Sequence, residues 1–247
     1  MGAIFLPIIL FIYNTIAFHN LGVAILEIAV LSRVIFYPLA RQQMHYSKKM
    51  SELQPHLSLL KEKHKDNKQA MAAAQMELFK QHGVNPAAGC LPALVQWVVL
   101  IGLLGAMNQI LTMHLQTKFL VWDMAKPDSF KIPSLQFALP GFLVIMSSIT
   151  YFIQSKMMFP AAPKVRKEDS PPEKVEKKEF AAEFAEAQAS MVWMFPLLFL
   201  FLGTQWPSGL ALYWSVSTLL TIIQQYQVSG LGGLEPYVIK FRKLARP

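Results

Sequence analysis

The stretch LSRVIFYPLARQQ, residues 31–43, places Arg33 in the middle of an apolar run. The residues before it, LGVAILEIAVLS, have the composition of a membrane helix, and VIFYPLA continues that composition. An arginine at such depth in a bilayer costs roughly 2.5–3.5 kcal/mol on insertion scales. The stretch therefore predicts a membrane helix whose arginine faces a polar environment that offsets this cost.

The composition of the whole chain agrees with a bilayer environment. Of 247 residues, 53% are hydrophobic and 15% are charged, and the mean hydropathy is +0.34. Soluble domains average about 25% charged residues. Cys90 is the single cysteine, which excludes an internal disulfide and a cysteine-cluster metal site. The sequence holds no GxxxxGK, HExxH or GxSxG motif, so we predict neither enzymatic activity nor a metal or other cofactor.

Five segments are long and apolar enough to cross a bilayer, which takes about 20 residues per helix. We predict spans at 21–42, 88–114, 135–156, 189–205 and 208–228. Residues 1–19 form a further apolar stretch, interrupted by Pro7, which we expect to be an amphipathic helix in the membrane interface instead of a span. The predicted fold is an all-α membrane protein with five transmembrane helices.

Lysine and arginine are distributed unevenly between the segments that join these spans. The segments 41–87 and 156–188 and the tail 229–247 are strongly basic, whereas the alternate segments carry only Lys118, Lys126 and Lys131. Because cytoplasmic loops are enriched in basic residues, we expect both long loops and the C-terminus to be cytoplasmic. The net charge of +8 then reflects topology more than nucleic-acid binding.

Residues 43–82 have the pattern of a cytoplasmic helical hairpin. One apolar stripe comprises Met50, Leu53, Leu57 and Leu60, and a second comprises Met71, Leu78 and Phe79. We expect a turn at Asp66-Asn67 with a capping box to Gln69, and a kink or restart of the first helix at Pro55. Exposed Met44 and Met50 would suit an adaptable contact surface. The alternative is a solvated hairpin with no such task.

The segment 157–179, rich in proline and charge, predicts a disordered cytoplasmic linker. Residues 180–190 then resume as a short helix, in which Phe180 and Phe184 lie one turn apart.

Arg33 has no obvious acidic partner in the predicted spans. Glu27 lies six residues earlier, about 240° round the helix, and so cannot pair with it. The spans also carry many serine, threonine and amide side chains, which we expect to face the bundle interior or a water-filled cavity. Most of the hydroxyls should bond to backbone or bridge helices. We infer a hydrated cavity that opens to the cytoplasm, closes on the outer side and compensates Arg33 with water.

Three segments resemble one family of proteins. VLSRVIFYPLARQQMHYSKKMSELQP, KQHGVNPAAGCLPALVQ and WPSGLALYWSVSTLLTIIQQY are similar to the YidC/Oxa/Alb membrane protein insertases, and the likeness runs from about Gly22 to Tyr226. The resemblance implies a hydrophilic groove carrying the positive charge of Arg33, through which nascent membrane proteins enter the lipid bilayer of the bacterial plasma (inner) membrane. It also implies that the hairpin recruits these clients, that the Sec translocon, the ribosome and targeting factors are partners, and that a monomer suffices.

Carried over by position, the substrate-binding residues implied by the resemblance are Arg33, Ala29, Gln96, Tyr213 and Trp214. Many members have a hydroxyl at the Ala29 position, and Ser32 is a candidate replacement. The large extracytoplasmic domain of Gram-negative members is absent, which indicates a Gram-positive-like protein or a shortened chain. The short tail makes strong autonomous ribosome binding unexpected.

Two other classes of function fit a polytopic membrane protein. One is a secondary transporter that uses Glu27 and Arg33 as an ion or proton relay, although the sequence shows no inverted repeat. The other is a passive assembly scaffold with the hairpin as its docking arm. An insertase would integrate a short client into liposomes without ATP or an ion gradient, which neither alternative would do.

Overall fold

The computed structural model describes residues 2–63, 68–84, 91–110, 112–113, 115–133, 137–158, 192–235 and 237–239. Most of these residues are helical. The helices are α1 (Gly2–Thr15), α2 (Leu21–Ile35), α3 (Tyr37–Lys63), α4 (Lys68–Gln81), α5 (Leu91–Ile110), α6 (Phe142–Met158), Val192–Leu202, α8 (Ser208–Ser229) and the short 3₁₀ helix η3 (Gly232–Leu234). The predicted disordered linker, the short helix 180–190, the turn at Asp66-Asn67 and Cys90 lie outside the described residues.

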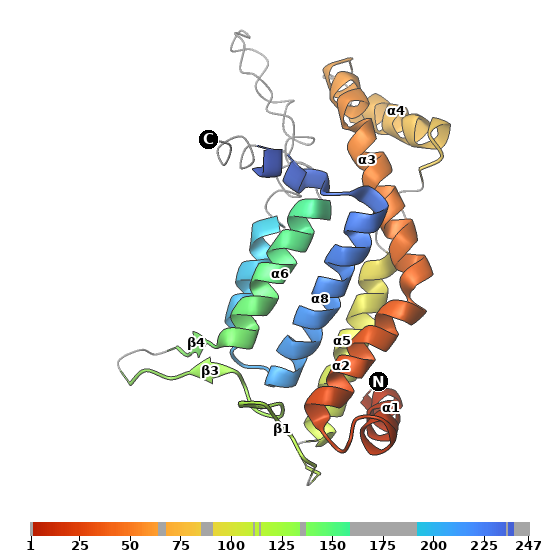
Figure 1. The fold of residues 1–247 in the computed structure, drawn as a ribbon. Coiled ribbons are helices and arrows are strands. Elements are labelled where there is room, and N and C mark those ends of the chain that lie inside the picture. The colour runs from red at the N-terminus through yellow and green to blue at the C-terminus, as the bar shows by residue number, and fades with distance from the viewer. Residues whose placement is uncertain are drawn as a thin grey trace.

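Helices α2, α5, α6 and α8 run side by side, and α8 packs against both α2 and α6 (Figure 1). Figure 1 shows α1 nearly end-on beside one end of the bundle, where it packs on α5 and α2. The hairpin of α3 and α4 rises from the opposite end, where α6 and α8 also finish. The described parts of the segments predicted to be cytoplasmic thus gather at one end of the bundle.

Glycines allow α1 to approach α5 closely. A Cβ atom built on Gly102 would lie 2.2 Å from the Phe5 ring, and one on Gly105 would lie 3.0 Å from the Cα of Gly2. Small residues at such contacts let two backbones come together, which is a common way for helices to pack in membranes. Ile9 and Ile12 of α1 are buried in the same apolar core as α2, α5, α6 and α8.

The chain bends sharply between α2 and α3, which meet at an angle of 64°. Pro38 explains the break, because it lacks the N–H that would bond to the Val34 carbonyl and its ring crowds that carbonyl. The Phe36 N–H instead donates to the carbonyls of Ser32 and Val34. Pro38 then occupies the first turn of α3, where the missing N–H costs little. The segment predicted as the first span, 21–42, thus contains two helices joined by a bend.

Length and hydropathy identify one bent pair of helices as a candidate span, namely Leu21–Ile35 with Tyr37–Met50. Among the described residues, no single helix meets the same criteria. Shorter apolar helices occur at Ile4–Thr15, Trp97–Ile110, Phe142–Met158 and Val192–Leu202.

The other predicted span boundaries agree unevenly with the helices. Helix α5 lies within 88–114, Val192–Leu202 lies within 189–205, and α8 matches 208–228 to within one residue. The start predicted at residue 135 is wrong, because α6 begins only at Phe142. A proline and a glycine, Pro140-Gly141, precede it and prevent an earlier helical start.

Two antiparallel ribbons lie at the end of the bundle opposite the hairpin, so the all-α prediction is incomplete (Figure 1). Strand β1 (Lys118–Phe119) pairs with β2 (Trp122–Asp123), and β3 (Ser129–Phe130) pairs with β4 (Leu139–Pro140). Two residues per strand are too few to show the alternation by which a strand is recognised in sequence.

Asp128 ties the second ribbon to the start of α6. Its carboxylate accepts the Leu143 N–H at 2.6 Å, and its backbone carbonyl accepts the Gly141 N–H at 2.8 Å. The carboxylate thus satisfies a donor in the first turn of the helix, as a capping side chain does. A Cβ atom at position 141 would lie 2.1 Å from a carboxylate oxygen of Asp128. The close approach of Asp128 to the start of α6 therefore requires glycine at this position.

The hairpin has a small apolar cluster of its own. Leu53, Leu57 and Val84 are buried there, and the half-buried side chains packed on them are Tyr46, Met50, Leu78 and Phe79. Leu60 is half-buried. Helix α3 is unbroken from Tyr37 to Lys63, so the predicted restart at Pro55 is wrong. The prediction that Met44 and Met50 form an exposed contact surface is also wrong, because Met44 is 5% exposed and Met50 packs on the cluster.

Candidate functional site

Arg33 lies in the last turn of α2 and faces α8. Its Nε donates a hydrogen bond to Oγ of Ser217 at 2.8 Å, and its side chain is half-buried. A hydrogen bond to a charged group is worth about 1.5–3 kcal/mol, which offsets part of the cost of placing arginine in apolar surroundings. We predicted that water compensates the charge of Arg33, and the Ser217 hydroxyl supplies part of that compensation.

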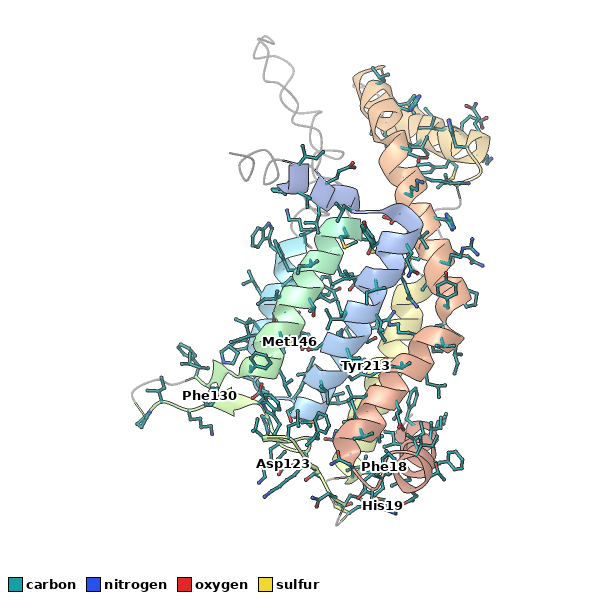
Figure 2. All side chains as sticks on the ribbon, in the orientation of Figure 1. Phe18, His19, Asp123, Phe130, Met146 and Tyr213 are labelled. Atoms are coloured by element: carbon teal, nitrogen blue, oxygen red, sulfur yellow. The ribbon has the colours of Figure 1, made fainter. Side chains whose placement is uncertain are left out.

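Ser32, which directly precedes Arg33, and Tyr213, one turn before Ser217, also join α2 to α8. The Ser32 hydroxyl donates to the Ala29 carbonyl at 2.9 Å and lies 3.5 Å from the Tyr213 hydroxyl. Figure 2 shows Tyr213 inside the bundle, and it is 3% exposed, while Ala29 is 0% exposed. Ser32 therefore supplies a hydroxyl in this region, next to a buried alanine.

Polar side chains continue along α8 beyond Ser217. Tyr213, Ser217 and Thr221 recur every four residues and so share one face of the helix. The Thr221 hydroxyl donates to the Ser217 carbonyl at 2.8 Å, and Gln225 is buried one turn further. The Gln224 Oε1 is buried and has no hydrogen-bond partner within the described residues. We call Ser32, Arg33, Tyr213, Ser217 and Thr221 the polar seam.

A second group of hydroxyls joins α6 to α8 away from Arg33. The Ser147 hydroxyl lies 2.7 Å from the Leu143 carbonyl, 2.8 Å from the Ala211 carbonyl and 2.8 Å from the Ser215 hydroxyl. These contacts confirm the expectation that hydroxyls in the spans bond to backbone or bridge helices. Asn108 and Gln109 of α5 are exposed and so do not face the bundle interior, the first of the two environments expected for them.

The remaining predicted contact residues lie apart from the seam or are not described. The Trp214 ring belongs to an aromatic cluster, 4.8 Å from the Phe199 ring and 6.3 Å from the Trp206 ring between centroids. Gln96 lies in α5, which the structure describes there only as backbone. The structure thus brings Arg33, Ala29 and Tyr213 together and places Trp214 in a different cluster.

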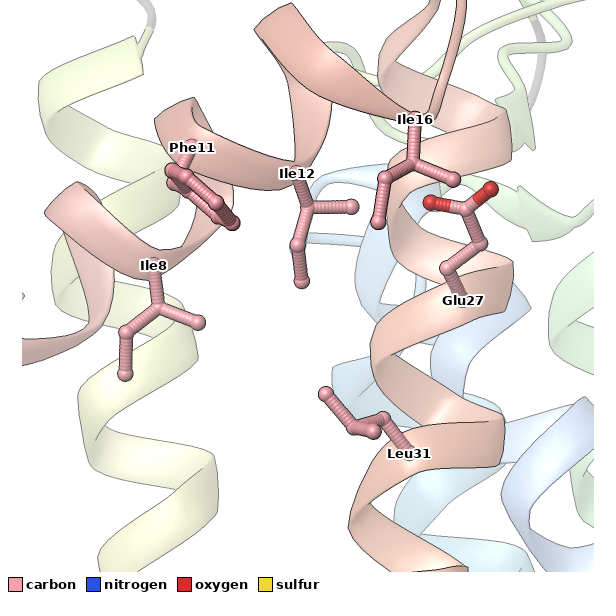
Figure 3. Close-up of a pocket in the computed structure, with 6 residues that line it drawn as sticks. All are labelled: Ile8, Phe11, Ile12, Ile16, Glu27 and Leu31. Carbon is pink, nitrogen blue, oxygen red and sulfur yellow. The ribbon is translucent and has the colours of Figure 1, made fainter.

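Glu27 is directed away from the seam, as its position on the helix predicts. It faces α1 across an apolar crevice, and its Oε2 is buried without a hydrogen-bond partner among the described residues (Figure 3). Within the described ranges no cluster of His, Cys, Asp and Glu could hold a metal ion. The polar seam offers one positive charge and several hydroxyl groups for hydrogen bonding.

Ser217 is a site residue that was not predicted individually, although it is one of the hydroxyl residues of the last predicted span. The sequence contained one signal for it, since polar residues recur every four positions at Tyr213, Ser217 and Thr221. That recurrence identifies a polar face of α8 but not the residue of α2 that meets it.

A helical bundle that exposes many large apolar side chains and holds a half-buried, hydrogen-bonded arginine is typical of a membrane protein with an internal polar site. A family model described as "60Kd inner membrane protein" matches residues 11–231, and the chain belongs to this family. This confirms the resemblance to the YidC/Oxa/Alb family and the assignment to a family of inner membrane proteins.

Individual relatives carry the name "Membrane protein insertase YidC". The relative from Geobacter sulfurreducens is 34% identical over 212 residues, which cover 85% of this chain and 34% of that protein. The relative from Pelobacter propionicus is 35% identical over 86% of this chain and 35% of its own length. The relative from Fusobacterium nucleatum is 30% identical over 86% of this chain and 88% of its own. The chain thus spans about a third of the first two and most of the third.

Proposed function

We propose that this chain is a membrane protein insertase that integrates newly made membrane proteins into the lipid bilayer. The hydrogen bond from Arg33 to Ser217 is the observation that carries the proposal, since it holds a positive charge inside an apolar bundle. Membership of a family whose relatives are named insertases supports the same function.

In this proposal the chain crosses the membrane five times, with the α2–α3 bent pair as the first crossing. The hairpin and the C-terminus are cytoplasmic, as their basic residues favour. A hydrated groove beside the polar seam opens toward the cytoplasm and toward lipid. The gathering of the hairpin and the ends of α6 and α8 at one end of the bundle is consistent with this orientation.

The proposed mechanism is electrostatic and needs no ATP. Arg33 attracts acidic residues in the short extracellular segments of a client, because opposite charges attract more strongly in a groove walled by protein and lipid than in bulk water. The seam hydroxyls, Ser32, Tyr213, Ser217 and Thr221, offer hydrogen bonds to polar groups of the moving segment. Both effects lower the free energy of a polar stretch inside the bilayer, after which the apolar client helix partitions sideways into lipid.

The hairpin is the proposed site of client recruitment, with the Sec translocon, ribosome and targeting factors as partners and a monomer as the working unit. Leu53, Leu57 and Val84 form a small apolar core within the hairpin, separate from the main core of the bundle. A transporter that relays ions between Glu27 and Arg33 is not favoured, because Arg33 bonds to α8 whereas Glu27 faces α1.

Reconstitution into liposomes tests the proposal directly. Purified protein should integrate a short single-span client in the absence of ATP and of an ion gradient, and a photocrosslinker at position 33 should capture a stalled nascent client. Liposomes that integrate no more client than protein-free vesicles would contradict the proposal.

A further inference from the structure

The structure contains an apolar crevice between α1 and α2 that the proposed function does not use. Its volume is about 320 Å³, at the lower end of the range for small-molecule sites. Figure 3 shows its lining, which comprises Ile8, Phe11, Ile12, Ile16, Glu27 and Leu31. Ile8, Phe11, Ile16 and Leu31 are each exposed by roughly half of their surface, so the crevice opens at the side of the bundle.

Glu27 is the one ionisable residue in this lining. Its Oε2 is buried, yet it has no hydrogen-bond partner in the described part of the chain. Glu27 itself is half-buried and lines the crevice, so a donor there meets the part of the carboxyl group that faces it, whereas Oε2 is enclosed by protein. A cationic donor stabilises a carboxylate held in such apolar surroundings. Arg33 does not supply it, since Arg33 lies about 240° round the helix and bonds to Ser217.

The crevice is polar at one end and apolar along the rest. In Figure 3 the Glu27 carboxylate lies beside Ile16, near the start of α2, and Leu31 lies one turn further along the helix. Ile12 forms the floor and is 5% exposed. A ligand that fits this pattern has a cationic hydrogen-bond donor at one end and a hydrocarbon chain at the other.

We propose that the crevice binds a phospholipid with a primary ammonium headgroup, whose ammonium pairs with Glu27 and whose acyl chain lies along Ile12 and Leu31. Charge complementarity selects this lipid, because an anionic headgroup is repelled by the carboxylate. A quaternary ammonium carries the same charge but has no N–H to donate, whereas a primary ammonium has three donors. The proposal rests on the membrane placement in the proposed function, though not on insertase activity.

Lipid photocrosslinking in reconstituted vesicles tests the site without any insertion assay. The full chain is placed in phosphatidylcholine vesicles that contain a trace of photoactivatable phosphatidylethanolamine, phosphatidylglycerol or phosphatidylcholine. Labelled peptides from residues 2–31 are then quantified by mass spectrometry. Phosphatidylethanolamine should label this region roughly tenfold more than the other two lipids, as a charge-assisted hydrogen bond would give.

Variants separate the contribution of the carboxylate from that of the apolar walls. Glu27→Gln should reduce labelling by phosphatidylethanolamine to the level of phosphatidylcholine, whereas Glu77→Gln, a matched change on the distant helix α4, should leave it unchanged. Leu31→Trp should fill the crevice and reduce labelling by all three lipids. Thermal unfolding of each variant identifies any loss of fold.

Equal labelling by the three lipids, or unchanged selectivity in Glu27→Gln, would overturn the proposal. A chain that shows selective labelling but integrates no client would leave the lipid site standing and remove the insertase function, so the two failures are distinguishable.

Discussion

Arg33 on α2 donates its Nε hydrogen to the Ser217 hydroxyl on α8, and the two atoms lie 2.8 Å apart. The contact joins residues that are 184 positions apart in the sequence. It places a fixed positive charge beside a row of hydroxyls on α8, and Ser217 accepts only one of the five N–H groups of the guanidinium.

Replacing Arg33 distinguishes the role of its charge from the role of its geometry. We expect Arg33→Lys to keep most insertion of clients with acidic extracellular segments, because lysine keeps the charge on a long stem. Arg33→Ala and Arg33→Glu should lose roughly tenfold or more, the effect of about 1.4 kcal/mol. Insertion into liposomes and thermal unfolding are measured together. An alanine variant that inserts acidic clients normally would contradict the charge mechanism.

Ser217→Ala removes the hydroxyl that accepts from Arg33. The loss of a hydrogen bond to a charged group, about 1.5–3 kcal/mol, should leave the guanidinium less well placed and reduce insertion most for acidic clients. Ser215→Ala is the matched control, because Ser215 contacts Ser147 on α6. That control should lower the melting temperature slightly with no dependence on client charge, and identical behaviour of the two variants would argue against a special role for Ser217.

The hairpin cluster can be weakened without touching the bundle. Leu57 is 6% exposed, and Leu57→Ala should destabilise the packing of α3 on α4 by about 2–5 kcal/mol, the usual cost of such a cavity. Leu59→Ala is the control, since Leu59 is 62% exposed. Hydrogen exchange should increase in α4 while α8 stays protected.

Deletion of residues 50–80 tests the task of the hairpin. We expect the bundle to stay folded, because the main apolar core does not include these residues, and insertion to be abolished. Thermal unfolding and the liposome assay report the two outcomes separately. Full activity after the deletion would disprove recruitment by the hairpin.

Asp128 caps α6 across the second ribbon, so its replacement should act on stability. Asp128→Ala should cost about 1 kcal/mol, within the usual range for loss of a capping side chain. Asp128→Asn keeps an oxygen that can accept the Leu143 N–H, and it should cost less. Thermal unfolding in detergent or nanodiscs measures both. Equal melting temperatures for the alanine variant and the unchanged protein would mean that the cap contributes nothing.

Much of the fold follows from local patterns in the sequence. Apolar runs predict the helices of the bundle, and the end of α8 is predicted to within one residue, where Gly230 follows the helix with a positive φ of 70°. The break before α3 could have been predicted from Pro38, whose missing N–H acts within one turn. Rotation along one helix was also enough to exclude a pair between Glu27 and Arg33. The family motifs carried the function class, since they preserve residue order and spacing over most of the chain.

Tertiary structure decided which residues meet. Helical periodicity assigns Arg33 and Ser217 to polar faces of their helices. The register of α2 against α8, however, depends on how all the helices of the bundle pack together. The same holds for Asp128, which caps a helix 14 positions further along the chain, and for Trp214, which packs on Phe199 and not beside Arg33. The sequence by itself determined the helices, their polar faces and the family. Only the packed bundle decided the partner of Arg33, because an interhelical contact depends on distances that local sequence does not contain.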